Sequence, residues 1–294
     1  MTRTLRRAVG LVIIGAVLPM VAAVRAATPS RIVSTSPSIT ETLFALGLGD
    51  RVVGVSEYCR FPPAVLKLPK VGTFLKPDAE PIAGLRPDLV FVHELSSGID
   101  RRLAALRIPF VVVDRGTLAS VFSAILQIAQ AAGEPARGES LVADIERRLQ
   151  QVRRGAVDAA RPSALFIIGR SPGTLTDLVA VGPGSYINDL IEIAGGRNVL
   201  AIQGQPEYPK ISMETVLRLD PDVIVDTVDM GETEGERRLR QPINERLWSA
   251  YPTLTAVKHR RVHAATTDAL VVPGPRVVDA AEWVASLLRA RTAR

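Results

Sequence analysis

The sequence is poor in the residues from which metal centres, disulfide frameworks and aromatic surfaces are built. Its 294 residues include one cysteine and three histidines, and 4% of them are aromatic. The lone Cys59 excludes an intramolecular disulfide and a cysteine-rich zinc module. The net charge is +6, and no basic stripe or aromatic RNA-binding motif accompanies it, so nothing in the sequence indicates nucleic acid as a partner. With 47% hydrophobic residues the chain can bury a sizeable core, and its length suffices for two lobes.

The amino-terminal segment is organised like a secretory signal peptide. Three arginines within the first seven residues precede an apolar run from Ala8 to Val24, and Val24-Arg25-Ala26 ends it with a small-x-small pattern. We predict that residues 1–26 are a signal peptide, cleaved after Ala26. The alternative is a membrane anchor, because about seventeen apolar residues approach the shortest helix that spans a bilayer. Residues 1–26 contain four arginines and no acids, so the exported chain has a net charge of +2.

Short apolar runs alternate with helical patterns through the rest of the chain. Continuous apolar runs indicate strands that are buried on both faces, as in the parallel sheets of α/β proteins. Strands are predicted at residues 31–35, 52–55, 89–92, 110–114, 164–168, 222–225 and 261–264. The predicted fold class is α/β with two similar lobes on parallel-type sheets, an N-terminal lobe over residues 27–132 and a C-terminal lobe over 162–294.

A long amphipathic helix is predicted in the linking segment 133–161. Large aliphatic side chains recur there at spacings of four and three residues, from Leu141 to Val152. A helix over 137–160 would be about 35 Å long at about 1.5 Å per residue, enough to connect the lobes as a single backbone helix. Such a helix resists bending, so we expect only a small closure of the lobes on ligand binding.

An internal repeat relates the two lobes. Residues 78–90 and 212–224 share a helix N-cap, a glutamate two residues later, a Pro-Asp pair and a strand, at a constant offset of 134 positions. Two related lobes leave a cleft between them, and such clefts are preferred ligand sites.

Several motifs follow one another along nearly the whole exported chain. They are Arg31-Ile32-Val33-Ser34-Thr35-Ser36-Pro37-Ser38-Ile39-Thr40-Glu41, Val53-Gly54-Val55-Ser56-Glu57-Tyr58, Phe61-Pro62-Pro63, Gly84-Leu85-Arg86-Pro87-Asp88-Leu89-Val90 and Gly195-Gly196-Arg197-Asn198-Val199. As a set they resemble the periplasmic substrate-binding proteins of ABC importers with a single helical backbone (class III), nearest to the branch that binds cobalamin or ferric siderophores. The resemblance implies a monomeric periplasmic receptor, not an enzyme and without a cofactor of its own. Such a receptor binds a corrinoid or an iron chelate and delivers it to the permease dimer of the inner membrane.

Glu80 and Glu214 hold equivalent positions in the repeat, each in the first turn of a predicted helix. A carboxylate there complements the helix dipole, which is one explanation for both residues. The dipole does not explain why the same acid occurs in both lobes. In the family that the chain resembles, a glutamate on each lobe docks onto an arginine pocket of the permease. The resemblance therefore implies that Glu80 and Glu214 are the permease-docking acids.

Side chains near the carboxyl ends of the predicted strands are expected to line the cleft. The candidate ligand-binding residues are Ser36, Tyr58, Phe74, His93, Arg170 and Tyr208. The resemblance implies aromatic contacts to a corrin ring from Tyr58, Phe74 and Tyr208, with His93 in place of a further aromatic residue. The alternative is that these side chains pack or hydrogen-bond the loops. Arg170 would pair with a carboxylate or phosphate of the ligand, or form a surface salt bridge.

Two other functions compete with the receptor. A receptor for a bare metal ion needs three or four convergent His, Asp or Glu ligands, and the chain has three histidines and no histidine-rich loop. An exported α/β enzyme is the second alternative. The sequence contains no H-E-x-x-H motif and no phosphate-binding loop that ends in Gly-Lys-Ser/Thr, so the receptor is the preferred hypothesis.

Overall fold

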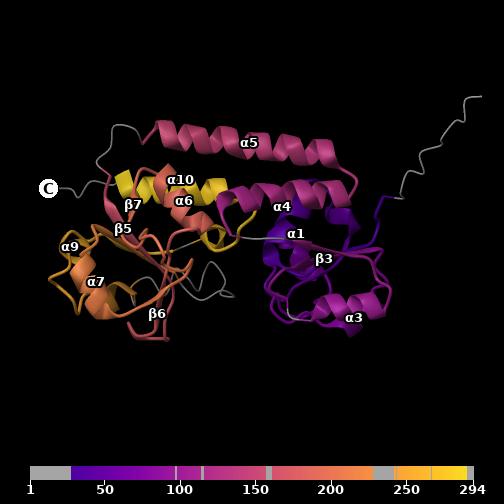
Figure 1. The fold of residues 1–294 in the computed structure, drawn as a ribbon, viewed down its shortest axis with the longest axis horizontal. Coiled ribbons are helices and arrows are strands. Elements are labelled where there is room, and N and C mark those ends of the chain that lie inside the picture. The colour runs from indigo at the N-terminus through magenta and orange to yellow at the C-terminus, as the bar shows by residue number, and fades with distance from the viewer. Residues whose placement is uncertain are drawn as a thin grey trace, which may run out of the picture.

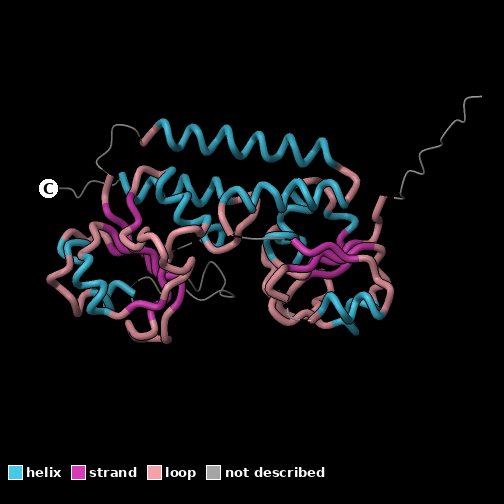
Figure 2. The backbone as a smooth tube through the Cα atoms, in the orientation of Figure 1, coloured by secondary structure: helices cyan, strands magenta, loops and turns pink. Residues whose placement is uncertain are grey.

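The computed structural model describes residues 28–96, 98–113, 116–156, 161–227, 242, 244–265 and 267–289. The predicted signal peptide lies outside the described residues. Each half of the chain contains one sheet, and a layer of helices extends over one side of both halves (Figures 1 and 2). This two-lobed α/β architecture confirms the predicted fold class.

The N-terminal lobe contains a parallel sheet in the order β2-β1-β3-β4. Its strands are β1 (Ile32–Ser34), β2 (Val52–Val55), β3 (Leu89–His93) and β4 (Phe110–Val113). Its helices are α1 (Pro37–Ala45), α2 (Ala79–Gly84) and α3 (Ile99–Ala105). All four predicted strands are confirmed to within one residue at either end. Every residue of β1 and β3 is buried, which explains their continuous apolar sequences.

The C-terminal lobe repeats this arrangement and adds to it. Strands β7, β5, β9 and β10 are parallel neighbours in that order, as are β2, β1, β3 and β4. The strands are β5 (Ser163–Gly169), β6 (Leu178–Ala180), β7 (Arg197–Asn198), β8 (Lys210–Ile211), β9 (Val223–Asp226) and β10 (Val262–Ala264). The helices are α6 (Tyr186–Ile193), α7 (Met213–Leu219), α9 (Thr255–Lys258) and α10 (Val277–Arg289). Strands β6 and β8 are antiparallel, so this sheet is mixed. The sequence analysis did not predict them, although Leu178-Val179-Ala180 is apolar, because both strands are short and are defined by their antiparallel pairing.

The repeat has the same structural role in both lobes. Asp88 accepts hydrogen bonds from the backbone N–H and the hydroxyl of Ser30, just before β1 (2.8 and 2.9 Å). Asp222 accepts the same two bonds from Ser163, at the start of β5 (2.7 Å each). The aspartate of each Pro-Asp pair therefore ties the strand that follows it to the central strand of its lobe.

Two antiparallel helices connect the lobes, α4 (Leu118–Ala131) and α5 (Pro135–Arg154), packed side by side (Figure 1). The 20 residues of α5 span about 30 Å. Helix α5 ends at Arg154 with Gly155 as its C-cap, short of the predicted end, and residues 157–160 of the predicted helix lie outside the described residues. Gly138 allows a close helix contact, since a Cβ there would lie 2.4 Å from the Cβ of Ala129.

Helix α4 belongs to the cores of both lobes. Val121 and Ile125 pack in the C-terminal core, whereas Ala124 and Ile128 pack in the N-terminal core. Leu141 of α5 contacts both cores as well. The single connecting helix of the prediction is therefore accompanied by a second one. Since α4 is shared, the exact residues that divide the lobes stay a prediction. Of the helices in the described part of the chain, none combines the length and the apolar character that crossing a bilayer requires.

Candidate functional site

A cavity of about 260 Å³ lies between the two lobes. Its lining residues are Phe74, His93 and Leu95 of the N-terminal lobe, Gly116 before α4, and Ile168, Tyr186, Ile187, Glu207, Tyr208, Val271 and Pro273 of the C-terminal lobe. The structure thus brings together three of the predicted residues, Phe74, His93 and Tyr208. Mostly apolar walls with a few polar groups are typical of small-molecule sites.

Tyr58, Phe74 and His93 form a row of rings on the N-terminal side of the cavity. The centroids of Tyr58 and Phe74 are 5.7 Å apart, and those of Phe74 and His93 are 5.8 Å apart. Both pairs are edge-to-face, with interplanar angles of 66° and 74°, which is a favourable aromatic geometry. Tyr58 contacts Phe74 and is not among the described residues that line the cavity, and its predicted contact with a ligand stays a prediction.

His93 ends β3 and is 8% exposed. Its backbone N–H donates to the hydroxyl of Thr35 (3.2 Å), and its Nδ1 accepts from the backbone N–H of Leu95 (3.2 Å). An imidazole that accepts through Nδ1 carries its proton on Nε2 when neutral, so Nε2 is a donor. His93 is thus hydrogen-bonded within its loop and also lies on the cavity wall, and its contact with a ligand stays a prediction.

Tyr186 is a cavity residue that the sequence analysis missed. It begins α6, directly after Ser185, whose hydroxyl caps the helix by accepting from the Asn188 N–H (3.1 Å). The Tyr186 hydroxyl donates to the carbonyl of Leu270 (2.7 Å). Burial raises the pKa of this phenol well above its usual range, so it stays protonated. The available signal was the N-cap serine followed by an aromatic residue.

Ser36 serves the fold of the N-terminal lobe. It is the N-cap of α1, with its hydroxyl 3.5 Å from the backbone nitrogen of Ile39 and 3.1 Å from the Ser38 hydroxyl. It is 2% exposed and is not among the described residues that line the cavity. A contact from Ser36 to a ligand stays a prediction.

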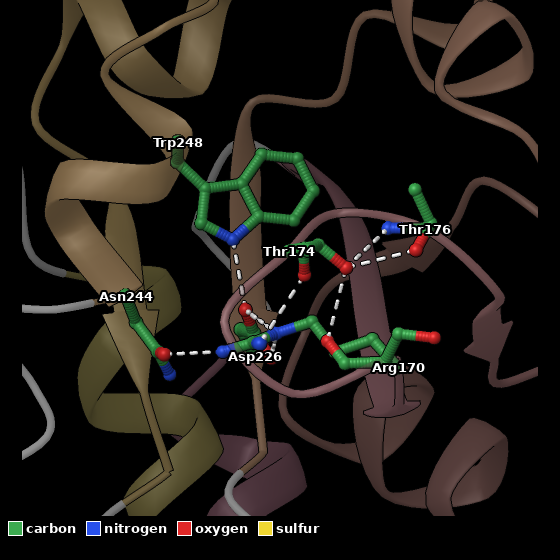
Figure 3. A network of polar contacts seen from close by, with 7 residues as sticks. Arg170, Thr174, Thr176, Asp226, Asn244 and Trp248 are labelled. Atoms are coloured by element: carbon green, nitrogen blue, oxygen red, sulfur yellow. Dashed lines mark hydrogen bonds and ion pairs between the residues drawn. The ribbon is translucent and has the colours of Figure 1, made fainter.

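Arg170 forms an ion pair with a buried carboxylate in the C-terminal lobe (Figure 3). Its Nε donates to both oxygens of Asp226 (3.0 and 3.2 Å), its Nη1 to the carbonyl of Thr174 (3.3 Å) and its Nη2 to Oδ1 of Asn244. The indole N–H of Trp248 donates to the same carboxylate (2.9 Å). Asp226 and Trp248 are 0% exposed. The alternative expected for Arg170 was a surface salt bridge; the structure shows a salt bridge, but it is buried in the lobe and not at the surface. Pairing with a ligand stays a prediction, and it would require this network to rearrange.

The segment Gly169-Arg170-Ser171-Pro172-Gly173 matches the G-x-S-x-G pattern of serine hydrolases, a match that the sequence analysis overlooked. In that motif the serine lies on a turn from a strand to a helix. Here the segment turns from β5 to the antiparallel β6, and the Ser171 hydroxyl donates to the carboxylate of Asp177 (2.6 Å). A hydroxyl that donates to an exposed carboxylate in a hairpin is not an activated nucleophile, so the motif does not support an enzyme.

The thiol of Cys59, which follows Tyr58 in the sequence, should be unreactive in the folded protein. Its thiol is 0% exposed and lies 3.2 Å from the hydroxyl of Thr40. Burial raises the pKa of Cys59 to about 11, so at pH 8 only about one thiol in a thousand is ionised. We expect no reaction of the native protein with Ellman's reagent at pH 8 over an hour, and one equivalent of thiol after denaturation in urea. Rapid reaction of the native protein would contradict this environment.

Glu80 and Glu214 are exposed and lie in the first turns of α2 and α7. Asp78 caps α2 by accepting from the Glu80 N–H (3.1 Å), and Ser212 caps α7 by accepting from the Thr215 N–H (3.3 Å). Helix α7, and helix α3 on which α2 packs, lie in opposite lobes on the side away from α5 (Figure 1). The predicted equivalence of the two positions is confirmed, and their role in docking stays a prediction.

Two related α/β lobes, a helical connection and an apolar cavity between the lobes define a two-lobed solute-binding protein. The described residues contain no group of three or more His, Cys, Asp or Glu side chains that could hold a metal ion. The sequence profile of the periplasmic binding protein family matches residues 32–269, and the chain belongs to this family.

Individual relatives agree with this assignment. The chain is 30% identical over 263 residues to the vitamin B12-binding protein of Vibrio cholerae, covering 88% of this chain and 89% of the relative. It is 29% identical over 263 residues to the ABC transporter substrate-binding lipoprotein YvrC of Bacillus subtilis, covering 87% and 79%. The apo structure of the periplasmic haem-binding protein RhuT of Roseiflexus sp. RS-1 superimposes with a TM-score of 0.76 at 28% identity, covering 88% and 97%. These findings confirm the resemblance drawn from the motifs, and the named relatives are binding proteins.

Proposed function

We propose that this protein captures a corrinoid or a related iron chelate between its lobes and delivers it to an ABC permease. The observation that supports this proposal is the cavity to which both lobes contribute apolar and aromatic side chains, Phe74 and His93 from one lobe and Tyr186 and Tyr208 from the other. No covalent chemistry is needed, because ring contacts and a few hydrogen bonds supply affinity. The chelate is cargo, and we propose no cofactor of the protein's own.

The volume of the cavity and the charges of its lining residues limit which ligand it can bind. A volume of about 260 Å³ is slightly below the ~300–1,000 Å³ of common small-molecule pockets, so a large planar chelate would enter by one edge. The described lining residues include no lysine or arginine. A polyanionic siderophore needs cations, whereas a corrin ring with neutral amide groups does not, so the lining favours the corrinoid over a polyanionic siderophore. The names of two relatives, a vitamin B12-binding and a haem-binding protein, support the same class of ligand.

The direct test is ligand binding by the purified exported protein. Visible absorption spectra and thermal shifts should be recorded with cyanocobalamin, haemin and ferrichrome as separate probes. We expect cyanocobalamin to raise the unfolding temperature most, because the cavity lining favours a corrinoid. A ligand at a hundred times its Kd stabilises the folded state by about 2.7 kcal/mol. A larger shift with haemin or ferrichrome would identify that chelate, and not a corrinoid, as the preferred ligand. No shift with any of the three would contradict the proposal.

Replacement of Tyr208 by alanine should weaken chelate binding. Loss of one buried aromatic contact of about 1.5–3 kcal/mol corresponds to an increase in Kd of about 10- to 100-fold. The matched control is Tyr251→Ala, in the same lobe but in the core cluster that does not reach the cavity. Tyr251→Ala should lower the unfolding temperature without changing Kd, as measured by titration of the visible spectrum. Equal effects of both variants on Kd would contradict a ligand contact by Tyr208.

We further propose that the protein works as a monomer in the periplasm after cleavage of residues 1–26. Glu80 and Glu214 are then the acids that dock onto the permease dimer. Two exposed carboxylates at equivalent places of the two lobes suit a partner with two equivalent basic pockets, because complementary charges at a fixed separation orient a complex.

A further inference from the structure

A segment of the C-terminal lobe reaches across to the N-terminal lobe just before α10. Arg276 donates through Nε to Oε2 of Glu41 on α1 (2.8 Å) and through Nη2 to Oε1 of the same carboxylate. Its Nη1 donates to Oδ1 of Asp268 in its own lobe (2.8 Å). The two members of the inter-lobe pair are 235 residues apart in the sequence.

Two further contacts hold the same segment against the N-terminal lobe. The guanidinium carbon of Arg276 lies 4.3 Å from the centre of the Phe61 ring, which is a cation–π geometry. Gly274 packs on the start of α1, where a Cβ would lie 3.4 Å from the carbonyl of Ser38. Arg276 is therefore held from both sides, by a ring and a carboxylate of one lobe and by a carboxylate of the other.

The energetics of this pair indicate a geometric role. The Glu41 side chain is 3% exposed and that of Arg276 is 16% exposed. Removing both charges from water costs about as much as their attraction returns, so a buried ion pair adds little stability over an apolar pair of the same size. A two-pronged arginine–carboxylate pair does fix distance and orientation, because its two hydrogen bonds are parallel and directional.

We propose that Arg276 is a positioning residue that holds the two lobes at a fixed separation and so sets the width of the cavity. The segment that carries it also forms the wall, since Val271 and Pro273 line the cavity a few residues earlier. The large helical contact through α4 and α5 joins the lobes along one side only, whereas the pair of Arg276 and Glu41 joins them beside the cavity. The separation of the lobes is a property of the ligand-free protein, and only its consequence for binding rests on the proposed function.

The test is a distance measurement between the lobes by pulsed electron paramagnetic resonance. Spin labels are placed at Arg101→Cys on α3 and Arg218→Cys on α7, both exposed, while the buried Cys59 stays unlabelled. The variants are Arg276→Met and the milder Glu41→Gln, which keeps the shape of the side chain. The matched control is Arg148→Met, which also removes an arginine from two carboxylates, Asp279 and Glu282, without breaking a contact to the N-terminal lobe.

In the ligand-free parent and in Arg148→Met we expect one narrow distance distribution. In Arg276→Met and Glu41→Gln the distribution should broaden and gain a longer-distance population, with a circular dichroism spectrum like that of the parent. If the binding-competent separation falls to about 10–30% of molecules, the Kd for cyanocobalamin rises about 3- to 10-fold. Unchanged distributions in folded Glu41→Gln and Arg276→Met would overturn the proposal. Failure of the parent protein to bind any chelate would contradict the proposed function. The distance measurements would still test whether Arg276 fixes the separation of the lobes.

Discussion

Replacement of Asp226 by alanine is expected to lower the free energy of unfolding by about 3–5 kcal/mol. The substitution leaves the guanidinium of Arg170 and the buried indole N–H of Trp248 without the carboxylate that accepts from both. A buried charge without its partner cannot recover its hydration, which is why breaking such a pair costs far more than the pair contributes. The measurement is urea unfolding followed by fluorescence, in which Trp248 itself reports on the network.

Two variants make this result specific. Asp226→Asn keeps one acceptor oxygen and should lose less stability than Asp226→Ala. Asp279→Ala also deprives an arginine, Arg148, of a carboxylate, but that carboxylate is 49% exposed, so the expected loss is about 1 kcal/mol or less. Similar losses for Asp226→Ala and Asp279→Ala would show that the network of Figure 3 does not organise the C-terminal lobe.

Charge reversal at both docking acids, Glu80→Lys with Glu214→Lys, is expected to abolish the stimulation of permease ATPase activity by this protein. Reversal places like charges opposite each other at two points of the interface, and this repulsion outweighs the remaining contacts. The Kd for the ligand should stay unchanged, because both residues lie in first helical turns outside the cavity lining. Stimulation is measured with the permease in lipid vesicles, with and without ligand.

The matched control for this experiment reverses two other exposed glutamates, Glu139→Lys with Glu146→Lys on α5. The change in net charge is the same, but it falls on the helix opposite the proposed docking side, so stimulation should persist. Each single reversal at Glu80 or Glu214 should leave partial stimulation. Full stimulation by the double variant, or a parallel loss of ligand binding, would contradict the docking role.

The strands and the relation between the lobes could be predicted from sequence because their signals are local. A strand such as β3 is buried along its whole length, so its apolar run is visible without knowledge of its neighbours. The Pro-Asp pairs of the repeat precede a strand in each lobe. There Asp88 and Asp222 accept hydrogen bonds from the backbone N–H groups of Ser30 and Ser163, respectively. The antiparallel β6 and β8 were missed, because they are short and are defined by pairing rather than by composition.

The site was predicted in part. His93 was found because it ends a predicted strand, and Phe74 and Tyr208 because the resemblance implies aromatic residues at their positions; the three do meet at one cavity. Tyr186 was missed because no local pattern shows that the first turn of α6 lies on the cavity wall. Arg170 was interpreted as a residue for the ligand or a surface salt bridge, because no local pattern reveals that Asp226 ends the neighbouring strand and faces it.

The sequence by itself determined the α/β class, the two lobes, the long helix between them and the two equivalent acids. The class and the helix follow from periodicities within a few tens of residues, whereas the two lobes and the two acids follow from short motifs that recur at an offset of 134 positions. Only the tertiary structure decided that α4 is shared by both cores and that Arg276 meets Glu41 across 235 residues. The physical reason is that buried contacts between distant segments depend on how the lobes pack, and neither arginine nor glutamate has a local preference that predicts such a partner.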